Sequence, residues 1–244
     1  MKTQNQILFT TSKKSDGSMR VTFPEMISEN LKNRSQFLKK FNLSHIDTVS
    51  PVLEHTKIVE LVSQKDKGKI LPNTDGLITN EPGVILTVTA ADCAPVFFFD
   101  PKNMAIGLAH EGWRGIDQNI TKELIEKMSK NFGTNPSDLL VHIGPHLRKC
   151  HFEVKEDVAE KFPDHTIIVN DGIFVDLSSK MQNQFLSLGL KPENISEDEN
   201  CTYCEHSTLF SYRREKPKVI QSFMAFITIP FPRGKVLEKT TAQF

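Results

Sequence analysis

Two histidines and a cysteine are the residues whose types could carry the most distinctive chemistry in this chain. His55, Cys93 and His110 each lie at the edge of an apolar segment, where a side chain can point into a cleft while its backbone stays fixed. Catalytic zinc takes three protein ligands and keeps one position open, and a His2Cys set meets that requirement. Their spacing matches no short metal-binding motif. An ordinary surface histidine at position 55 and a buried, inert thiol at position 93 therefore stay open as alternatives.

A second feature is the segment Gly-Trp-Arg-Gly at residues 112–115, immediately before a predicted helix. Free backbone N–H groups at the start of a helix, together with a guanidinium group, suit an anion such as phosphate. Arg114 is therefore the first candidate for binding phosphate. The alternative is that Trp113 packs in the core and that Arg114 pairs with a structural carboxylate.

The C-x-x-C pair of Cys201 and Cys204 could belong to a structural zinc site or a redox site. A closed zinc site needs two more ligands, which Cys150, His151 or His206 could supply. No second C-x-x-C pair and no histidine pair with zinc-finger spacing follows. The sequence therefore leaves this site as an alternative to ordinary free thiols.

The elements that must position these residues follow from apolar periodicity and turn signals. Strands are expected over residues 84–90, 94–99, 104–110, 139–143 and 219–229, and helices over 30–41, 116–132 and 177–188. Gly133 and Gly189 are expected to end the second and third of these helices. Cys93 and His110 would then lie where strands meet loops.

The organisation of the chain indicates one domain. No internal repeat, low-complexity tract or Gly/Ser linker divides the 244 residues, so residues 1–244 are expected to form a single domain. Strands are followed by helices in the middle of the chain, whereas the N-terminal region is more typical of hairpins. The expected fold class is therefore α+β (mixed α/β), with a mixed central sheet flanked by helices.

Charge and composition narrow the classes of function. The 30 basic residues balance 30 acidic residues, which argues against a general nucleic-acid binder and against a polybasic membrane-surface protein. Near the N-terminus only Ile7 to Phe9 form an apolar run, so no signal-peptide core is expected, and no segment approaches the roughly 20 apolar residues of a membrane span. We therefore expect a cytoplasmic protein whose 4 cysteines are thiols.

Four segments closely resemble the YfiH family, which also goes by laccase-domain protein, multicopper polyphenol oxidase and peptidoglycan editing factor. They are TAADCAPVFFFDP at residues 89–101, GLAHEGWRGI at 107–116, IGPHLRKCHFEV at 143–154 and CTYCEHSTLFSYRRE at 201–215. They occur in the family's order, and weaker matching such as DGLIT at 75–79 extends the resemblance over about residues 45–215. In this resemblance the CTYC segment is a family motif near the active site rather than a metal-binding motif.

The resemblance implies a YfiH-like fold and a zinc ion (Zn2+) bound by His55, Cys93 and His110. It also implies an enzyme that acts on purine nucleosides and phosphate. The family is associated with phosphorolysis of adenosine, inosine and methylthioadenosine to the base and ribose 1-phosphate, and with deamination of adenosine. We expect such an enzyme to work as a monomer.

Further site residues come from the same resemblance. Arg34 and Arg213 resemble family positions and join Arg114 as candidates for binding phosphate, although Arg213 could instead close the core in an ion pair. For deamination, zinc would activate a water molecule for attack on C6 of adenine. Asp92, next to Cys93, is the candidate proton carrier. Its alternative role is that of a side chain at a strand end, bonded to backbone amides.

The chain departs from the family's pattern beside two of the expected ligands. The family's first ligand usually lies in Gln-Val-His-Gly, whereas this chain has Leu53, Glu54, His55 and Thr56. Glu111 stands after His110 where the family usually has alanine. We expect this carboxylate either to hydrogen-bond a metal ligand or to face solvent.

Two other functions stay open as alternatives. A non-catalytic, zinc-stabilised factor that binds a partner in cell-wall physiology would turn over no nucleoside. A copper-dependent polyphenol oxidase of the multicopper type would need about ten histidines for its copper centres. This chain has 8 histidines and no H-x-H pair, so the ligand count disfavours the oxidase.

Overall fold

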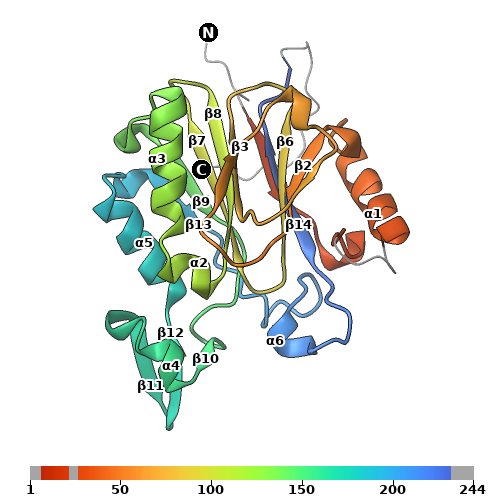
Figure 1. The fold of residues 1–244 in the computed structure, drawn as a ribbon. Coiled ribbons are helices and arrows are strands. Elements are labelled where there is room, and N and C mark those ends of the chain that lie inside the picture. Colours follow the sequence, from red (N-terminus) through yellow and green to blue (C-terminus); the bar gives the residue numbers. More distant parts are fainter. Residues whose placement is uncertain (1–6, 22–26, 232–244) are drawn as a thin grey trace.

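Two large β-sheets pack face to face in the computed structural model, which describes residues 7–21 and 27–231 (Figure 1). One sheet has the order β1 (Leu8–Thr11), β14 (Phe223–Thr228), β6 (Ile85–Ala90), β2 (Thr48–Pro51) and β4 (Ile70–Leu71). The other has the order β13 (Ile195–Glu197), β9 (Leu140–Ile143), β7 (Ala94–Asp100), β8 (Ala105–Glu111), β5 (Gly76–Thr79) and β3 (Val59–Leu61). A small third sheet contains β10 (Glu153–Val154), β12 (Gly172–Val175) and β11 (Thr166–Val169).

Helices cover the outer faces of the two large sheets, which gives four layers (Figure 1). The helices are α1 (Ile27–Lys39), α2 (Trp113–Asp117), α3 (Ile120–Phe132), α4 (Glu156–Ala159), α5 (Leu177–Ser187) and α6 (Tyr212–Glu215). Helix α1 packs on the five-stranded sheet through Phe37 and Leu38, whereas α3 and α5 pack on the six-stranded sheet. Between the sheets, Phe97 and Leu108 from one meet Leu86 of the other in a shared apolar core.

The mixed fold class predicted from the sequence is confirmed. Parallel pairs such as β2–β6 and antiparallel pairs such as β7–β8 occur in the same sheets. The expectation of one central sheet is refined, because the strands divide between two large sheets. The expected N-terminal hairpin is wrong: β1 pairs antiparallel with β14, from the opposite end of the described chain.

The helix predicted over residues 116–132 is interrupted. Helix α2 ends at Asp117, and α3 begins at Ile120 after Asn119, whose φ of 60° lies in the left-handed region. The Asn119 side chain accepts a hydrogen bond from the Lys122 amide, so it caps the second helix. An apolar pattern that continues across a short break does not reveal this change of direction. The predicted end at Gly133 is confirmed, with a φ of 72° and an amide bonded to the Ser129 carbonyl.

A three-residue link between the sheets positions the site. Strand β6 ends at Ala90 in the five-stranded sheet, and β7 begins at Ala94 in the six-stranded sheet. The intervening Asp92 has a φ of 102°, a conformation that a non-glycine residue adopts only under local constraint. This sharp crossing places Cys93 at one end of both sheets.

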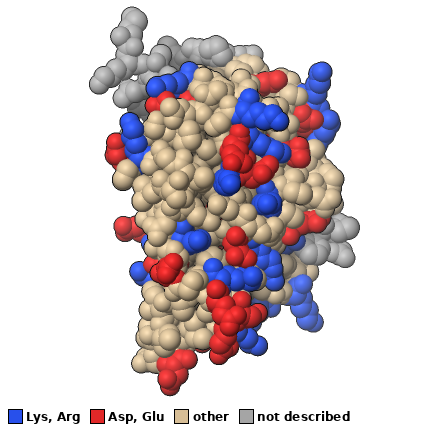
Figure 2. Space-filling model, turned by 60° about the vertical axis from the view of Figure 1, so that its left-hand side comes forward, with Lys and Arg blue, Asp and Glu red and all other residues tan. Residues whose placement is uncertain are grey.

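The described surface carries charges of both signs. On the face drawn in Figure 2, basic and acidic side chains are interspersed rather than gathered by sign, as the equal numbers of the two kinds allow. Within residues 7–21 and 27–231, every helix is too short or too polar to cross a lipid bilayer.

Candidate metal centre and adjoining cavity

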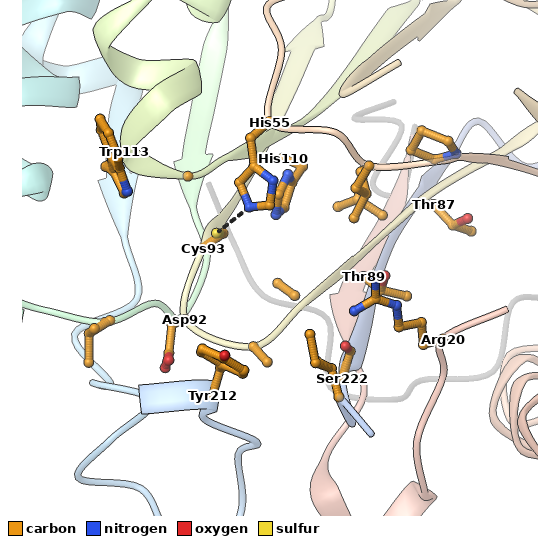
Figure 3. A pocket seen from close by; sticks show the side chains of 18 of the residues that line it. Arg20, His55, Thr87, Thr89, Asp92, Cys93, His110, Trp113, Tyr212 and Ser222 are labelled. Carbon is orange, nitrogen blue, oxygen red and sulfur yellow. Dashed lines mark hydrogen bonds between the residues drawn. The ribbon is translucent and has the colours of Figure 1, made fainter. Parts of the chain in front are cut away.

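His55, Cys93 and His110 come together from three separate segments of the chain (Figure 3). His55 lies in the loop between β2 and β3, Cys93 in the link between β6 and β7, and His110 in β8. One potential ligand atom of each lies within 4.8 Å of those of the others. Cys93 Sγ is 3.8 Å from His55 Nε2, and the two imidazole rings are 5.0 Å apart at 72°. The three residues thus form a compact group with the donor atoms of a zinc site.

A buried carboxylate that the sequence interpretation missed, Asp75, holds two of these residues. Its Oδ1 accepts a hydrogen bond from His110 Nδ1 at 2.9 Å and from the His55 amide at 3.1 Å. The amide and hydroxyl of Thr56 donate to Oδ2. These bonds hold His55 at a φ of 59°, in the left-handed region. They also leave Nε2 of His110 as the nitrogen for a ligand, an arrangement common around metal-bound histidines.

Cys93 and His110 stabilise each other's charged forms, so a metal ion that binds both residues would displace the second proton of His110. Burial opposes ionisation of Cys93, but the neighbouring His110 and His55 outweigh it and lower the pKa of the thiol to about 6. Burial also disfavours the charged form of His110, yet Cys93 and Asp75 raise its pKa to about 10. At neutral pH Cys93 is therefore a thiolate, which is the form that ligates metals.

Gly112 gives the group the space it needs. A Cβ atom added at this residue would lie 2.8 Å from Cys93 Sγ and 2.9 Å from His55 Cδ2, which no ordinary contact allows. The backbone of Gly112 has a φ of −78° and a ψ of 167°, which any residue can adopt. The glycine is therefore required by the close approach of the two donor residues. We call this space at Gly112, beside Cys93 and His55, the cradle. The cradle and the donor set fit a bound zinc ion.

A cavity of about 360 Å³ opens beside this group, and all three residues line it. Its polar lining residues include Arg20, Arg34, Thr87, Thr89 and Ser222, and its apolar ones include Leu53, Leu147, Phe152, Leu177 and Ile220. In Figure 3, Trp113 lies on one side of the histidines and cysteine, and Arg20, Thr87, Thr89 and Ser222 lie on the other. The size and the mixed lining are those of a site for a small organic ligand.

Arg34 brings a buried positive charge to this cavity. Its Nε donates to the Met19 carbonyl at 2.6 Å, and its Nη1 donates to Ser50 Oγ at 2.9 Å. Burial lowers the pKa of the guanidinium to about 10, so it stays charged at neutral pH. Within residues 7–21 and 27–231, no carboxylate forms an ion pair with Arg34. A buried cation of this kind calls for an anionic partner.

Asp92 and Arg213 form part of the cavity wall. The Asp92 carboxylate accepts hydrogen bonds from Thr202 Oγ1 and from the Arg213 amide, both at 2.6 Å. The Arg213 guanidinium donates to the carbonyls of His151 and Glu153. Both predicted site residues are thus at the cavity, and their polar groups already engage protein partners.

Arg114 lies outside the cavity lining. It is the second residue of the five-residue helix α2, and its exposed guanidinium stacks over the Trp113 ring at 4.2 Å. Trp113 is half-buried against the core and lines the cavity. The structure therefore brings Arg34 and Arg213, but not Arg114, to the space beside the histidines and cysteine.

Glu111 contradicts both expectations for it. It neither bonds a metal-site residue nor faces solvent: its side chain is buried, and Oε1 accepts a hydrogen bond from Thr121 Oγ1 of α3 at 2.7 Å. Burial raises the pKa of this carboxyl to about 7. The physical reason is strand alternation, because neighbours in β8 point to opposite faces, so Glu111 points away from the side that His110 occupies.

Comparisons with known proteins agree with this architecture. Residues 24–229 match the family described as multi-copper polyphenol oxidoreductase laccase. The chain is 32% identical over 214 residues to purine nucleoside phosphorylase YlmD of Bacillus subtilis (strain 168), covering 81% of this chain and 76% of that protein. It is 27% identical over 184 residues to adenosine deaminase RL5 of an unknown prokaryotic organism, covering 69% and 70% of the two chains.

A solved structure shows the same fold. The crystal structure of YlmD from Geobacillus stearothermophilus superposes with a TM-score of 0.87 at 25% sequence identity, and the match covers 92% of each chain. The resemblance drawn from the four sequence segments is thereby confirmed. The chain belongs to the multi-copper polyphenol oxidoreductase laccase family, which is the YfiH family.

Proposed function

We propose that this chain is a zinc-dependent purine nucleoside enzyme. Its main reaction would be phosphorolysis of adenosine, inosine and methylthioadenosine to the free base and ribose 1-phosphate, with deamination of adenosine as a second reaction. The observation that carries the proposal is the shared cavity: the His55, Cys93 and His110 group lines the same space as the buried cation Arg34. The names of the relatives YlmD and RL5 support the substrate class.

Zinc fits the donor set because two imidazoles and a thiolate leave one position open for a further ligand. When bound, it would supply Lewis-acid polarisation of an oxygen atom. Asp75 would keep His110 oriented through the bond to Nδ1, and the cradle at Gly112 would keep Cys93 and His55 at their close approach.

The polar end of the cavity suits phosphate. This is the side where Arg20, Thr87 and Thr89 lie (Figure 3). Arg34 joins it by donating to Ser50, whose Oγ is 2.7 Å from Thr87 Oγ1. A phosphate held there would approach C1′ of the ribose. Its oxygen would form the new bond to C1′ while the bond from C1′ to the purine nitrogen breaks, and the leaving base would keep the electron pair and take up a proton.

The other lining residues suit a purine base. Trp113, Tyr212 and Phe152 offer aromatic faces in the same cavity, and such faces stack well on a flat heterocycle. For deamination, Asp92 beside Cys93 is the proposed proton carrier. Arg213 donates from its guanidinium to two carbonyls. We propose that it keeps the wall of the cavity near Asp92 in place.

Two alternatives make different demands on the site. A non-catalytic factor does not explain why Arg34, a buried cation without an ion pair among residues 7–21 and 27–231, lines the cavity beside the histidines and cysteine. A multicopper oxidase needs a cluster of histidines beside a mononuclear copper. Within the described residues, one group with metal-ligand geometry contains two histidines, His55 and His110, and the other contains one, His151. These are too few histidines for the copper centres of such an oxidase.

Product analysis tests the proposal. The purified protein would be incubated with adenosine or inosine, with and without phosphate, and the products separated by chromatography. Base and ribose 1-phosphate that form only with phosphate would support phosphorolysis, and inosine formed from adenosine in buffer alone would support deamination. A zinc-loaded protein that yields neither product would overturn the proposal.

A further inference from the structure

We propose that Cys150, His151, Cys201 and Cys204 bind one zinc ion in a second, structural site. Cys150 and His151 lie in the turn between β9 and β10, and the two other cysteines lie between β13 and α6. One potential ligand atom of each of the four residues lies within 4.8 Å of those of the others. None of the four lines the cavity, so this Cys3His group is separate from the site described above.

Three of the distances within the group lie close to those expected for tetrahedral zinc, and the ligand atom of Cys201 lies within 4.8 Å of the others. With Zn–S bonds of about 2.3 Å and a Zn–N bond of about 2.1 Å, two sulfur ligands lie about 3.8 Å apart, and a sulfur and a nitrogen lie about 3.6 Å apart. Cys150 Sγ is 3.9 Å from Cys204 Sγ. His151 Nδ1 is 3.2 Å from Cys150 Sγ and 3.4 Å from Cys204 Sγ. A zinc ion would therefore need little movement of Cys150, His151 and Cys204.

The chemistry of the group indicates a structural role. Three cysteines and one histidine fill all four positions of a tetrahedral site, as in closed zinc sites, whereas a catalytic site keeps one position open. His206, which the sequence also offered as a ligand, is exposed and outside the group. The ligand that completes the site is His151.

Contacts around the group hold its ligands in place. The His151 ring stacks on the Tyr203 ring, with centroids 4.0 Å apart and planes at 15°. Arg214 donates to the carbonyls of Thr202 and Tyr203, at 2.6 and 2.7 Å, in the segment that links the two cysteines of the C-x-x-C pair. The ligand-bearing loops are thus ordered by the protein, which lowers the entropic cost of forming the site.

The same loops support one wall of the cavity, because they form hydrogen bonds with Asp92 and Arg213, which line it. Thr202, between Cys201 and Cys204, donates to Asp92, and the His151 carbonyl accepts from Arg213. A metal that ties together segments 54 residues apart, as Cys150 and Cys204 are, would stabilise the fold and hold this wall. We expect its loss to lower the melting temperature and to raise the KM for the nucleoside, without removing the metal held by Cys93.

Zinc counts on single variants test this inference. Zinc would be measured by mass spectrometry of protein purified in reductant, for the wild type, Cys150→Ser, Cys93→Ser and the control His206→Ala. We expect two equivalents in the wild type and in His206→Ala, and one in each cysteine variant. Cys150 and Cys204 are exposed, so Cys204→Ser provides a second test if Cys150→Ser fails to fold.

A spectroscopic measurement identifies the ligands. In a Cys93→Ser background loaded with cobalt(II), thiolate-to-cobalt charge-transfer absorption would come from this site alone, and we expect Cys150→Ser to abolish it. Equal zinc in Cys150→Ser and the wild type would overturn the inference. So would a disulfide within the group accompanied by no metal uptake after reduction. Failure of nucleoside turnover, by contrast, would bear only on the proposed function.

Discussion

Asp75 holds His110 through a hydrogen bond of 2.9 Å from Nδ1 to Oδ1, with both side chains buried. The same carboxylate accepts the amides of Glu54, His55 and Thr56. One side chain therefore sets both the ring of one proposed ligand and the loop that carries another. Its pKa is lowered because the bonds from His110 and Thr56 outweigh the opposing effect of burial.

Replacing this carboxylate is expected to weaken metal binding. Asp75→Asn keeps the size of the side chain but removes its charge, and loss of such a partner typically costs about 10–100-fold in metal affinity. Competition for zinc with a chromophoric chelator would measure the metal affinity of the variant and of the wild type. Asp100→Asn is the matched control, because Asp100 is also buried and accepts the amides of Lys102 and Asn103, at the far end of β7. Equal zinc affinity in Asp75→Asn and the wild type would contradict the role of Asp75.

Gly112→Ala is expected to close the metal site. The new Cβ would lie 2.8 Å from Cys93 Sγ and 2.9 Å from His55, so the donor atoms would have to separate. We predict at least a tenfold loss of turnover, about 1.4 kcal/mol, with zinc content lowered in parallel. Gly115→Ala is the control, since its nearest contacts would lie at ordinary distances of 3.5 Å and more. If both variants retain wild-type zinc and turnover, the cradle at Gly112 plays no part in the site.

Arg34→Gln is expected to raise the KM for phosphate by about tenfold or more, because the variant removes the buried positive charge from the cavity. Deamination of adenosine, which uses no phosphate, should change much less. The matched variant is Arg114→Gln, which alters an exposed arginine outside the lining. A larger rise in KM for Arg114→Gln than for Arg34→Gln would favour the sequence-based assignment over the structural one.

His142 is expected to make stability depend on pH. Burial lowers its pKa below the ordinary value of 6.5, although Asp198 and Glu197 oppose this. Because the unfolded chain then binds more protons than the folded one, stability is present above about pH 6.5 and is lost as the pH falls through the folded pKa. One histidine changes the free energy of unfolding by at most about 1.4 kcal/mol per pH unit. Urea unfolding between pH 5 and 8 should show a flatter profile for His142→Gln, and an unchanged profile would contradict this.

Much of the fold was predictable because the central strands β6, β7 and β8 are apolar and six or seven residues long. The predicted strand over 94–99 corresponds to β7 and the one over 104–110 to β8, each buried along its whole length. Strands buried on both faces carry no alternation, so periodicity could not show that β6 and β7 belong to different sheets. The pairing of β1 with β14 was likewise hidden, because it joins the two ends of the described chain.

The candidate site was only partly visible in the sequence. Residue type made His55, Cys93 and His110 candidates, the resemblance to the YfiH family grouped them as ligands, and the structure brings them together. Asp75 was missed because its role depends on contacts from two other segments, although its place just before the buried strand β5 was a usable signal. Arg114 was favoured from its position beside a helix start, but the direction of its side chain, over Trp113, depends on tertiary packing.

The central claim is that nucleoside turnover takes place at the His55, Cys93 and His110 group. Its most direct test measures zinc content and phosphate-dependent release of hypoxanthine from inosine in the same samples of wild type and Cys93→Ser. We predict that the wild type releases hypoxanthine only with phosphate. We also predict that Cys93→Ser, folded by circular dichroism, binds one zinc ion fewer and turns over at least about a thousandfold more slowly. Wild-type turnover in a Cys93→Ser protein that has lost this zinc would contradict the claim.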